Sequence, residues 1–192
     1  MSERLRGVNL SGWFIPESWV TPSLYAATGA SDATELQQAL GAPEYTERLR
    51  QHYETFIGEF DFERMAAIGF NAVRLPVPWY VFGSQNDSCA HIPAIDYVDR
   101  AFEWASKYDM RVLLDLATVP GGQGDSNDRS DASDVVADWH SSTTGRAVAL
   151  EVLERLASRY GGQSALYGIE LLDSPVMSVR KGLFSKTDGI PS

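Results

Sequence analysis

The sequence predicts an α/β fold in which parallel strands and helices alternate within a single domain. Four short and nearly continuous apolar runs recur along the 192 residues, at 7–10, 71–77, 111–116 and 166–172. Runs of this length are typical of parallel strands that are buried on both faces. Amphipathic segments separate the runs, and a regular alternation of strand and helix is the pattern of a parallel sheet covered by helices.

Each strand after the first follows at least one predicted helix. Helices are expected at 43–57 and 60–68, and Gly69 then occupies the kind of position that glycine favours just beyond a helix C-terminus. A helix at 94–108 precedes the third strand, and another at 144–160 precedes the fourth. The apolar stripe of the helix at 94–108 consists of Ile95, Val98, Phe102, Trp104 and Ala105. The inward-facing residues of the helix at 144–160 are expected to be Ala147, Leu150, Leu153, Leu156 and Ala157.

Composition narrows the class of protein. The hydrophobic fraction of 44% and the charged fraction of 22% are those of an ordinary soluble globular protein. A net charge of −10 argues against nucleic acid or an anionic membrane surface as the partner. The N-terminus lacks the apolar run of a signal peptide and no stretch approaches the ~18 apolar residues of a membrane span, so we expect a cytoplasmic protein.

The sequence offers no clear metal-binding pattern. Cys89 is the single cysteine, which excludes an intramolecular disulfide and a cysteine-based metal site. The long loop at 121–138 is rich in aspartate, and oxygen ligands suit calcium, but the spacing fits no EF-hand, so a solvated acidic loop is favoured. The histidines are scattered at His52, His91 and His140. We therefore expect neither a cofactor nor a metal ion.

Segments spread over nearly the whole chain resemble the exo-β-1,3-glucanase branch of glycoside hydrolase family 5. They occur in the same order as in that family, at residues 6–13, 17–24, 52–57, 69–76, 105–108, 114–116, 120–123 and 169–175. The resemblance implies a (β/α)₈ barrel with its site at the C-terminal ends of the strands. It also implies one partial barrel domain over residues 1–192, of about four βα units, that stops before the second half.

The resemblance further implies a retaining reaction that uses two carboxylates about 5–5.5 Å apart. In the family the acid lies at the end of the fourth strand and the nucleophile on the seventh, which falls outside these 192 residues. Glu17 matches a residue that hydrogen-bonds the sugar, and Gln123 lies in a matching loop segment. Trp19 could stack on a sugar, as could Trp13, although core packing is the commoner role of such a residue.

Arg74 matches the family arginine that supports the nucleophile. It lies inside an otherwise apolar strand. Because a buried charge is costly when it is unpaired, we expect Arg74 to have a partner and a role in or beside the site. The sequence does not say which residue that partner is.

The same comparison reveals departures at four site positions. Ala117 replaces a histidine that contacts a sugar hydroxyl, and Asp128 belongs to an Asn-Asp pair where the family has Asp-Asn. Asp173 replaces the asparagine that holds the sugar's 2-hydroxyl, and Ser174 replaces the acid itself. A serine cannot protonate a leaving oxygen at neutral pH, and such assistance is typically worth 10²–10⁴-fold.

Neither neighbouring carboxylate is a good replacement for the lost acid. Asp173 is adjacent to Ser174, and adjacent strand residues point to opposite faces. Glu170 also has a counterpart in the family beside the real acid, which favours a structural, hydrogen-bonded carboxylate.

Three hypotheses follow from the sequence. The first is a β-glucan hydrolase lineage whose present chain is inactive. The second is a non-catalytic relative that still binds β-glucan or an oligosaccharide. The third is an interaction protein, because a half-barrel exposes strand edges and an apolar face that a second copy or a separate chain could cover. The sequence does not separate β-1,3 from β-1,4 preference.

Overall fold

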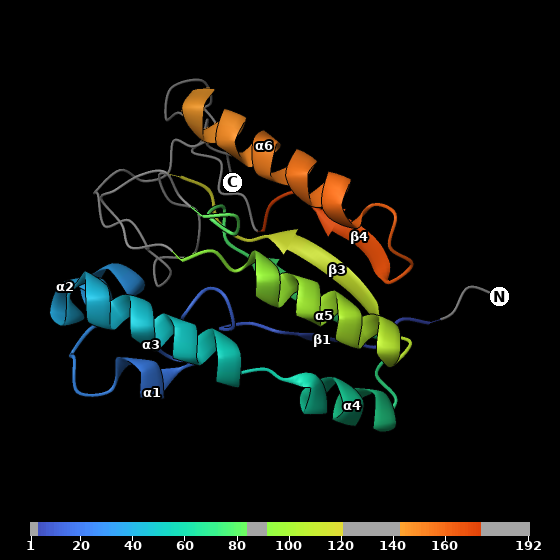
Figure 1. Ribbon diagram of the computed structural model, residues 1–192, viewed down its shortest axis with the longest axis horizontal. Coiled ribbons are helices and arrows are strands. Elements are labelled where there is room, and N and C mark those ends of the chain that lie inside the picture. The colour runs from blue at the N-terminus through green and yellow to red at the C-terminus, as the bar shows by residue number, and fades with distance from the viewer. Residues whose placement is uncertain (1–3, 84–91, 121–142, 174–192) are drawn as a thin grey trace, which may run out of the picture.

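Parallel strands form the centre of the molecule. The computed structural model describes residues 4–83, 92–120 and 143–173. In these segments β1 (Gly7–Asn9), β2 (Ala72–Val77), β3 (Arg111–Leu116) and β4 (Leu166–Glu170) form one sheet in chain order. Every neighbouring pair is parallel, and Figure 1 shows where β3 and β4 lie among the helices. The predicted α/β fold and the four predicted strands are therefore confirmed.

The helices between the strands also match the prediction. They are α3 (Ala42–Thr55), α4 (Glu59–Ala67), α5 (Ile95–Lys107) and α6 (Thr143–Tyr160). Gly69 has a φ of +95°, the left-handed conformation expected of a glycine just past a helix end. None of the helices in the described segments combines the length and the hydropathy needed to cross a bilayer.

Two further helices were not predicted from the sequence. They are α1 (Pro22–Tyr25), a single turn, and α2 (Ala33–Leu40). The Asp32 side chain caps α2 by accepting a hydrogen bond of 2.8 Å from the backbone N–H of Glu35. Aspartate followed three residues later by glutamate is a recognisable helix start. That local signal could have revealed α2.

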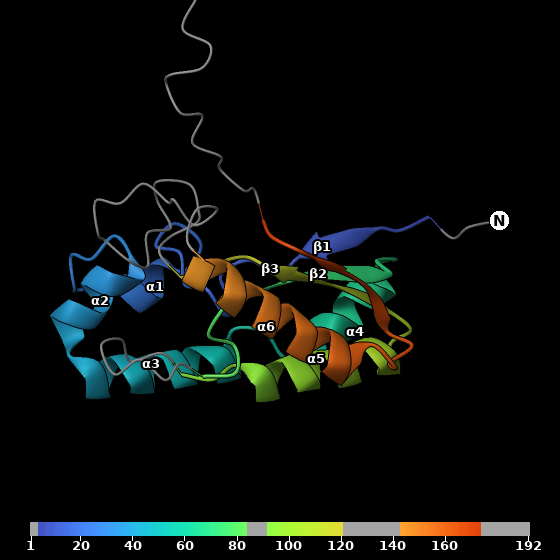
Figure 2. The same cartoon turned by 90° about the horizontal axis from the view of Figure 1, so that it is seen from above.

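The helices cover only one face of the sheet. Seen from above in Figure 2, α3, α4, α5 and α6 lie on the same side of the strands, and no described helix covers the opposite face. Alternate residues of β2 and β3 point toward these helices and are fully buried, namely Val73, Leu75, Val77, Val112, Leu114 and Leu116. Their neighbours along the strands form the uncovered face, on which Arg74 lies.

The buried face of α6 differs from the expected one. The residues that pack inward are Gly145, Ala149, Val152, Leu156 and Tyr160. Of the expected set, Leu156 is buried, whereas Leu150 is 60% exposed. Small and apolar residues occupy two adjacent stripes of this helix, so a 3.6-residue period fits both. Only packing against the sheet and α5 selects between them.

Core packing fixes the loop that follows β1. Trp13 is fully buried, and its indole N–H donates a 2.9 Å hydrogen bond to the carbonyl of Tyr53 on α3. The Trp13 ring also stacks on Trp104 of α5. At Gly12, which has a φ of +78°, an added Cβ would lie 2.6 Å from a methyl group of Val20. Trp13 is thus a core residue, and the loop packs closely against the side chains of Val20 and Thr21 at Gly12.

Candidate functional site

Arg74 is the centre of a cluster of charged side chains on the uncovered face of the sheet. Its Nε lies 2.8 Å from one oxygen of Glu170, and an Nη lies 3.1 Å from the other. The same Nη lies 3.0 Å from Asp115 and 3.2 Å from Asp173. We call these four residues the Arg74 cluster. The expected partners of Arg74 therefore exist and are acids, and Glu170 is the hydrogen-bonded carboxylate that the sequence suggested.

Strand register brings the cluster together. Pro76 of β2 pairs with Asp115 of β3, which in turn pairs with Glu170 of β4. Residues two apart on a strand share a face, so Arg74 points to the same side as this row. Its long side chain reaches along the strand to the carboxyl groups near the C-terminal ends. Asp173 follows β4, and its backbone N–H donates to Leu116 at 3.1 Å.

Asp115 is the most perturbed group of the cluster. Its side chain is 0% exposed. Among the described residues no donor is oriented to hydrogen-bond either of its oxygens, although Arg74 is close. Burial raises the pKa of Asp115 to about 7, and the negative charges of Glu170 and Asp173 act in the same direction, while the Arg74 guanidinium opposes them. The Asp115 carboxyl therefore changes between its protonated and ionised forms near neutral pH.

Arg74 stays positively charged at neutral pH. Its hydrogen bonds to Glu170 raise the pKa of the guanidinium above its ordinary value, and the nearby carboxylates add to this effect. A second polar side chain, Asn9 of β1, has its oxygen 3.5 Å from Arg74. The bidentate contact to Glu170 fixes the plane of the guanidinium as well as its position.

Glu17 and Trp19 lie in the loop after β1, next to this cluster. The backbone carbonyl of Glu17 accepts hydrogen bonds from the N–H groups of Val20 at 2.9 Å and Thr21 at 2.8 Å, which form a tight turn. Burial raises the pKa of the half-buried Glu17 carboxyl, a hydrogen bond from the Trp19 side chain lowers it, and the charge of Asp173 raises it again. These interactions place the Glu17 carboxyl beside Trp19 and within the field of Asp173. The Trp19 ring itself is 71% exposed.

The structure thus gathers four of the residues that the sequence singled out, namely Glu17, Trp19, Arg74 and Asp173. Gln123, Asp128 and Ser174 lie outside the described residues. Within the described segments, no group of three histidine, cysteine, aspartate or glutamate side chains is arranged to hold a metal ion. The aspartate-rich loop at 121–138 also lies outside those segments.

Sequence reasoning did not identify Asp115 as a site residue. The signal was available, because Asp115 is a lone acid inside an apolar strand, just as Arg74 is a lone base inside another. Two buried charges of opposite sign on predicted neighbouring strands are candidates for a pair. Which residues of the two strands are level with each other depends on register, and the sequence does not give it.

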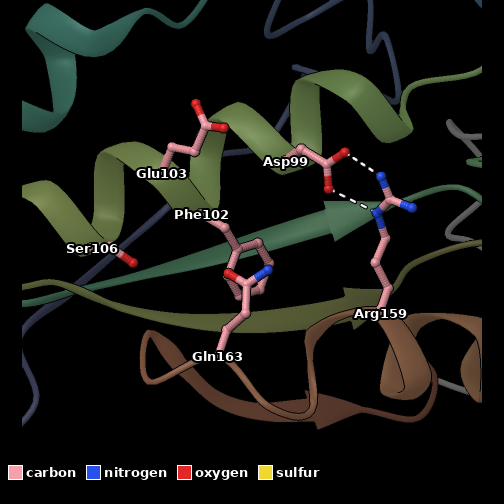
Figure 3. Close-up of a pocket in the computed structure, with 6 residues that line it drawn as sticks. All are labelled: Asp99, Phe102, Glu103, Ser106, Arg159 and Gln163. Atoms are coloured by element: carbon pink, nitrogen blue, oxygen red, sulfur yellow. Dashed lines mark hydrogen bonds and ion pairs between the residues drawn. The ribbon is translucent and has the colours of Figure 1, made fainter.

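The described segments also contain two hollows away from this cluster's carboxyl groups. One, of about 320 Å³, lies on the uncovered sheet face, where Leu5, Val8, Leu113 and Tyr167 line it and Arg74 borders it. The other, of about 490 Å³, lies on the outer surface between α5 and α6. Figure 3 shows the latter, with Arg159 reaching across from α6 to Asp99 on α5.

Comparisons with known proteins agree with this architecture. No family model matches the chain. A protein named Glucan 1,3-beta-glucosidase 2 from Wickerhamomyces anomalus is 37% identical over 187 residues, which cover 93% of this chain and 43% of that protein. Glucan 1,3-beta-glucosidase from Pichia angusta is 33% identical over 183 residues, covering 92% and 42%. The solved structure of a rutinosidase from Aspergillus niger superposes with a TM-score of 0.76 at 21% identity, covering 92% of this chain and 50% of that one.

Together the sheet, its helical layer and these likenesses define the first half of a TIM barrel of the glycoside hydrolase class. More closely, the chain belongs to glycoside hydrolase family 5, in the branch of the glucan 1,3-β-glucosidases. It spans about two fifths of the length of the curated relatives that it matches. The resemblance on which the sequence interpretation rests is therefore confirmed.

Proposed function

We propose that this chain supplies the sugar-binding side of a β-glucan site of the retaining-glycosidase type, without the proton donor that hydrolysis requires. The observation that carries the proposal is the grouping of Glu17, Trp19 and Asp173 around Arg74 at the C-terminal ends of the strands. In TIM barrels this end of the sheet is where substrates bind.

The chemistry of the group suits a neutral sugar. Carboxylates accept hydrogen bonds from hydroxyl groups, and an exposed indole ring offers a flat apolar surface for the C–H face of a pyranose. Glu17 and Asp173 supply the acceptors, while Trp19 supplies the ring. The relatives are named as glucan 1,3-β-glucosidases, which supports a β-glucan as the ligand.

Loss of hydrolysis follows from the residue at position 174. The leaving oxygen of a glycoside must be protonated as the bond breaks, and a carboxylic acid of raised pKa performs this step. Ser174 has a hydroxyl group that does not ionise in the required range. Glu170 and Asp115 do not replace it, because both contact Arg74 and Asp115 is fully buried. Binding therefore persists while turnover is lost.

Two measurements on the 192-residue chain test this proposal. A reducing-sugar assay on β-1,3-glucan is expected to show no release above background, and measurable turnover would contradict the loss of the acid. Titration with laminari-oligosaccharides, followed by calorimetry or NMR, is expected to show binding at millimolar concentration or below. Absence of any binding in that range would reject the glucan-binding proposal.

Matched variants locate the binding site. Trp19→Ala is expected to weaken laminaritriose binding by up to about tenfold, because an aromatic contact contributes about 0.5–1.5 kcal/mol beyond area burial. Phe60→Ala is the control, since Phe60 is also a large exposed aromatic residue but lies on α4. Equal effects of the two substitutions would show that the Trp19 loop is not the binding surface.

A second candidate function is favoured by the uncovered sheet face. Tyr167 of β4 is a large exposed residue, and together with Leu5 and Leu113 it lines the hollow on this face that Arg74 borders. We propose that this face pairs with a second copy or with a chain that carries the rest of a barrel. Light scattering tests this alternative, and a stable monomer that does not bind such a chain would reject it.

A further inference from the structure

We propose that the site prefers a β-linked oligosaccharide that carries protonated amino groups, such as a glucosamine oligomer, over a neutral glucan. The inference rests on the proposed function, because it concerns the ligand of the same site. It identifies Asp173 as the residue that determines this preference, and Glu17 as its neighbour of the same charge.

The charge balance of the site is the first reason. One guanidinium, that of Arg74, is shared by Asp115, Glu170 and Asp173. Glu17 adds a further carboxyl within the field of Asp173. The described part of the cluster thus contains more acidic than basic groups, and a cationic ligand would bring a further positive charge to it. A neutral sugar supplies hydroxyl donors but no compensating charge.

The state of Asp115 is the second reason. Its carboxyl is fully buried, and no donor among the described residues is oriented to hydrogen-bond it. Burial is the main cause that raises the pKa of Asp115; the charge of Arg74 lowers it, and the charges of Glu170 and Asp173 raise it further. One guanidinium thus contacts this buried acid and two further carboxyl groups at the same time. A cation bound at the rim would lower the negative potential that Asp115 experiences, so ligand binding and the charge of Asp115 are coupled.

Access to the cluster determines where such a cation would bind. The side chains of Asp173 and Glu170 are 39% and 35% exposed, so they form the solvent-facing rim, whereas Asp115 lies beneath. A carboxylate has about four acceptor positions, so Asp173 can accept from a ligand ammonium while it contacts Arg74. The exposed Trp19 ring is attractive to cations as well as to sugar rings. These features together fit an ammonium group attached to a pyranose.

Titration of the full chain with matched trisaccharides tests the preference. The glucosamine trimer and cellotriose share the β-1,4 linkage and differ at the 2-position, where one has an ammonium group and the other a hydroxyl. Below the pKa of the amine we expect the glucosamine trimer to bind about tenfold more tightly, the scale of one charge-assisted hydrogen bond. The N-acetylated trimer, which keeps the ring but loses the charge, is expected to lose this advantage.

Two variants assign the effect to the site. Asp173→Asn is expected to reduce the advantage of the glucosamine trimer over cellotriose to threefold or less, while the loss of an acceptor for sugar hydroxyl groups weakens both trimers alike. Glu63→Gln removes the same charge from an exposed position on α4 and is expected to leave the preference unchanged. Circular dichroism first establishes that each variant is folded. If Asp173→Asn is not folded, the original chain alone tests the charge preference. Equal binding of the N-acetylated and the free glucosamine trimer would then overturn it.

The outcomes separate this inference from the proposed function. If no trisaccharide binds, laminaritriose included, the proposed function fails and the inference fails with it. If cellotriose or laminaritriose binds as tightly as the glucosamine trimer, the proposed function stands and the charge preference is wrong. Equal losses in Asp173→Asn and Glu63→Gln would show a general attraction of an acidic protein for cations, which also overturns the inference.

Discussion

Two arginines of this molecule, each paired with acids across neighbouring elements, differ sharply in how well their charges balance. On the outer surface, Arg159 of α6 forms a two-point ion pair with Asp99 of α5, its Nε lying 2.8 Å from one oxygen (Figure 3). The Tyr160 hydroxyl donates to the same carboxylate at 2.7 Å. On the uncovered sheet face, Arg74 is instead shared by three carboxyl groups.

The pKa values of the two buried or half-buried aspartates reflect this difference. The hydrogen bonds from Arg159 are the main cause that lowers the pKa of Asp99 below its ordinary value, so its charge is stabilised. In the other cluster, burial raises the pKa of Asp115 to about 7. A balanced pair therefore joins two helices, whereas the imbalanced cluster lies near the C-terminal ends of the strands. An excess of like charges lowers the stability of the fold. Such an excess is therefore found more often at functional sites, where function offsets the lost stability.

The largest expected effect comes from removing the central guanidinium. Arg74→Met leaves Asp115 without its nearest cation and separates Glu170 from its bidentate partner. We expect a loss of about 3 kcal/mol in the free energy of unfolding at pH 7, the scale for breaking a buried ion pair. Urea denaturation measures this loss.

Arg159→Met is the matched control for that substitution. Its ion pair is partly exposed, so we expect a loss of no more than about 1 kcal/mol, and less in high salt. If both variants lost the same stability, the contrast between a site cluster and a helix-joining pair would not hold.

The next effect concerns pH. Because the folded-state pKa of Asp115 is about 7 and lies above its unfolded value, the stability linked to its proton is fully present below about pH 4 and is lost as the pH rises to 7. Asp115→Asn removes this titration. We expect the stability difference between pH 5 and pH 7 to change by roughly 2 kcal/mol relative to the original chain, measured by denaturation at each pH.

Asp99→Asn is the comparison variant, because the pKa shift of Asp99 on folding has the opposite sign to that of Asp115. The pKa of Asp99 is lowered in the folded state, so its stabilisation is present above the unfolded pKa and is lost as the pH falls through the folded value. This variant should therefore be less sensitive to acid below pH 4 and should leave the pH 5 to 7 range unchanged. An unaltered profile for Asp115→Asn between pH 5 and 7 would disprove the assignment.

The smallest effect is expected at the tyrosine of the outer pair. Tyr160→Phe removes the hydroxyl that donates to Asp99 but keeps the ring, which stacks on Phe102. We expect a loss of about 1 kcal/mol, the usual net value of one hydrogen bond. Thermal unfolding followed by circular dichroism measures it, and a loss as large as that of Arg74→Met would place the outer pair on a level with the site cluster.

Local sequence patterns predicted most of the fold. The four strands and the helices α3 to α6 were expected within about two residues of their bounds, because apolar periodicity and glycine positions are local properties. The family resemblance then pointed to Glu17, Arg74 and Asp173 as site residues, and the structure brings them together. The roles of Gln123, Asp128 and Ser174 remain predictions of that resemblance, since these residues lie outside the described segments.

By itself, the sequence determined that these strands are parallel and buried and that a charged residue such as Arg74 inside one of them needs partners. Tertiary structure alone decided which partners these are, because Glu170 is 96 residues away and meets Arg74 through strand register. It also decided that Trp13 is buried in the core whereas Trp19 is exposed beside the cluster. Two tryptophans in one short segment are alike in local pattern, and only the position of α3 and α5 against the loop distinguishes them.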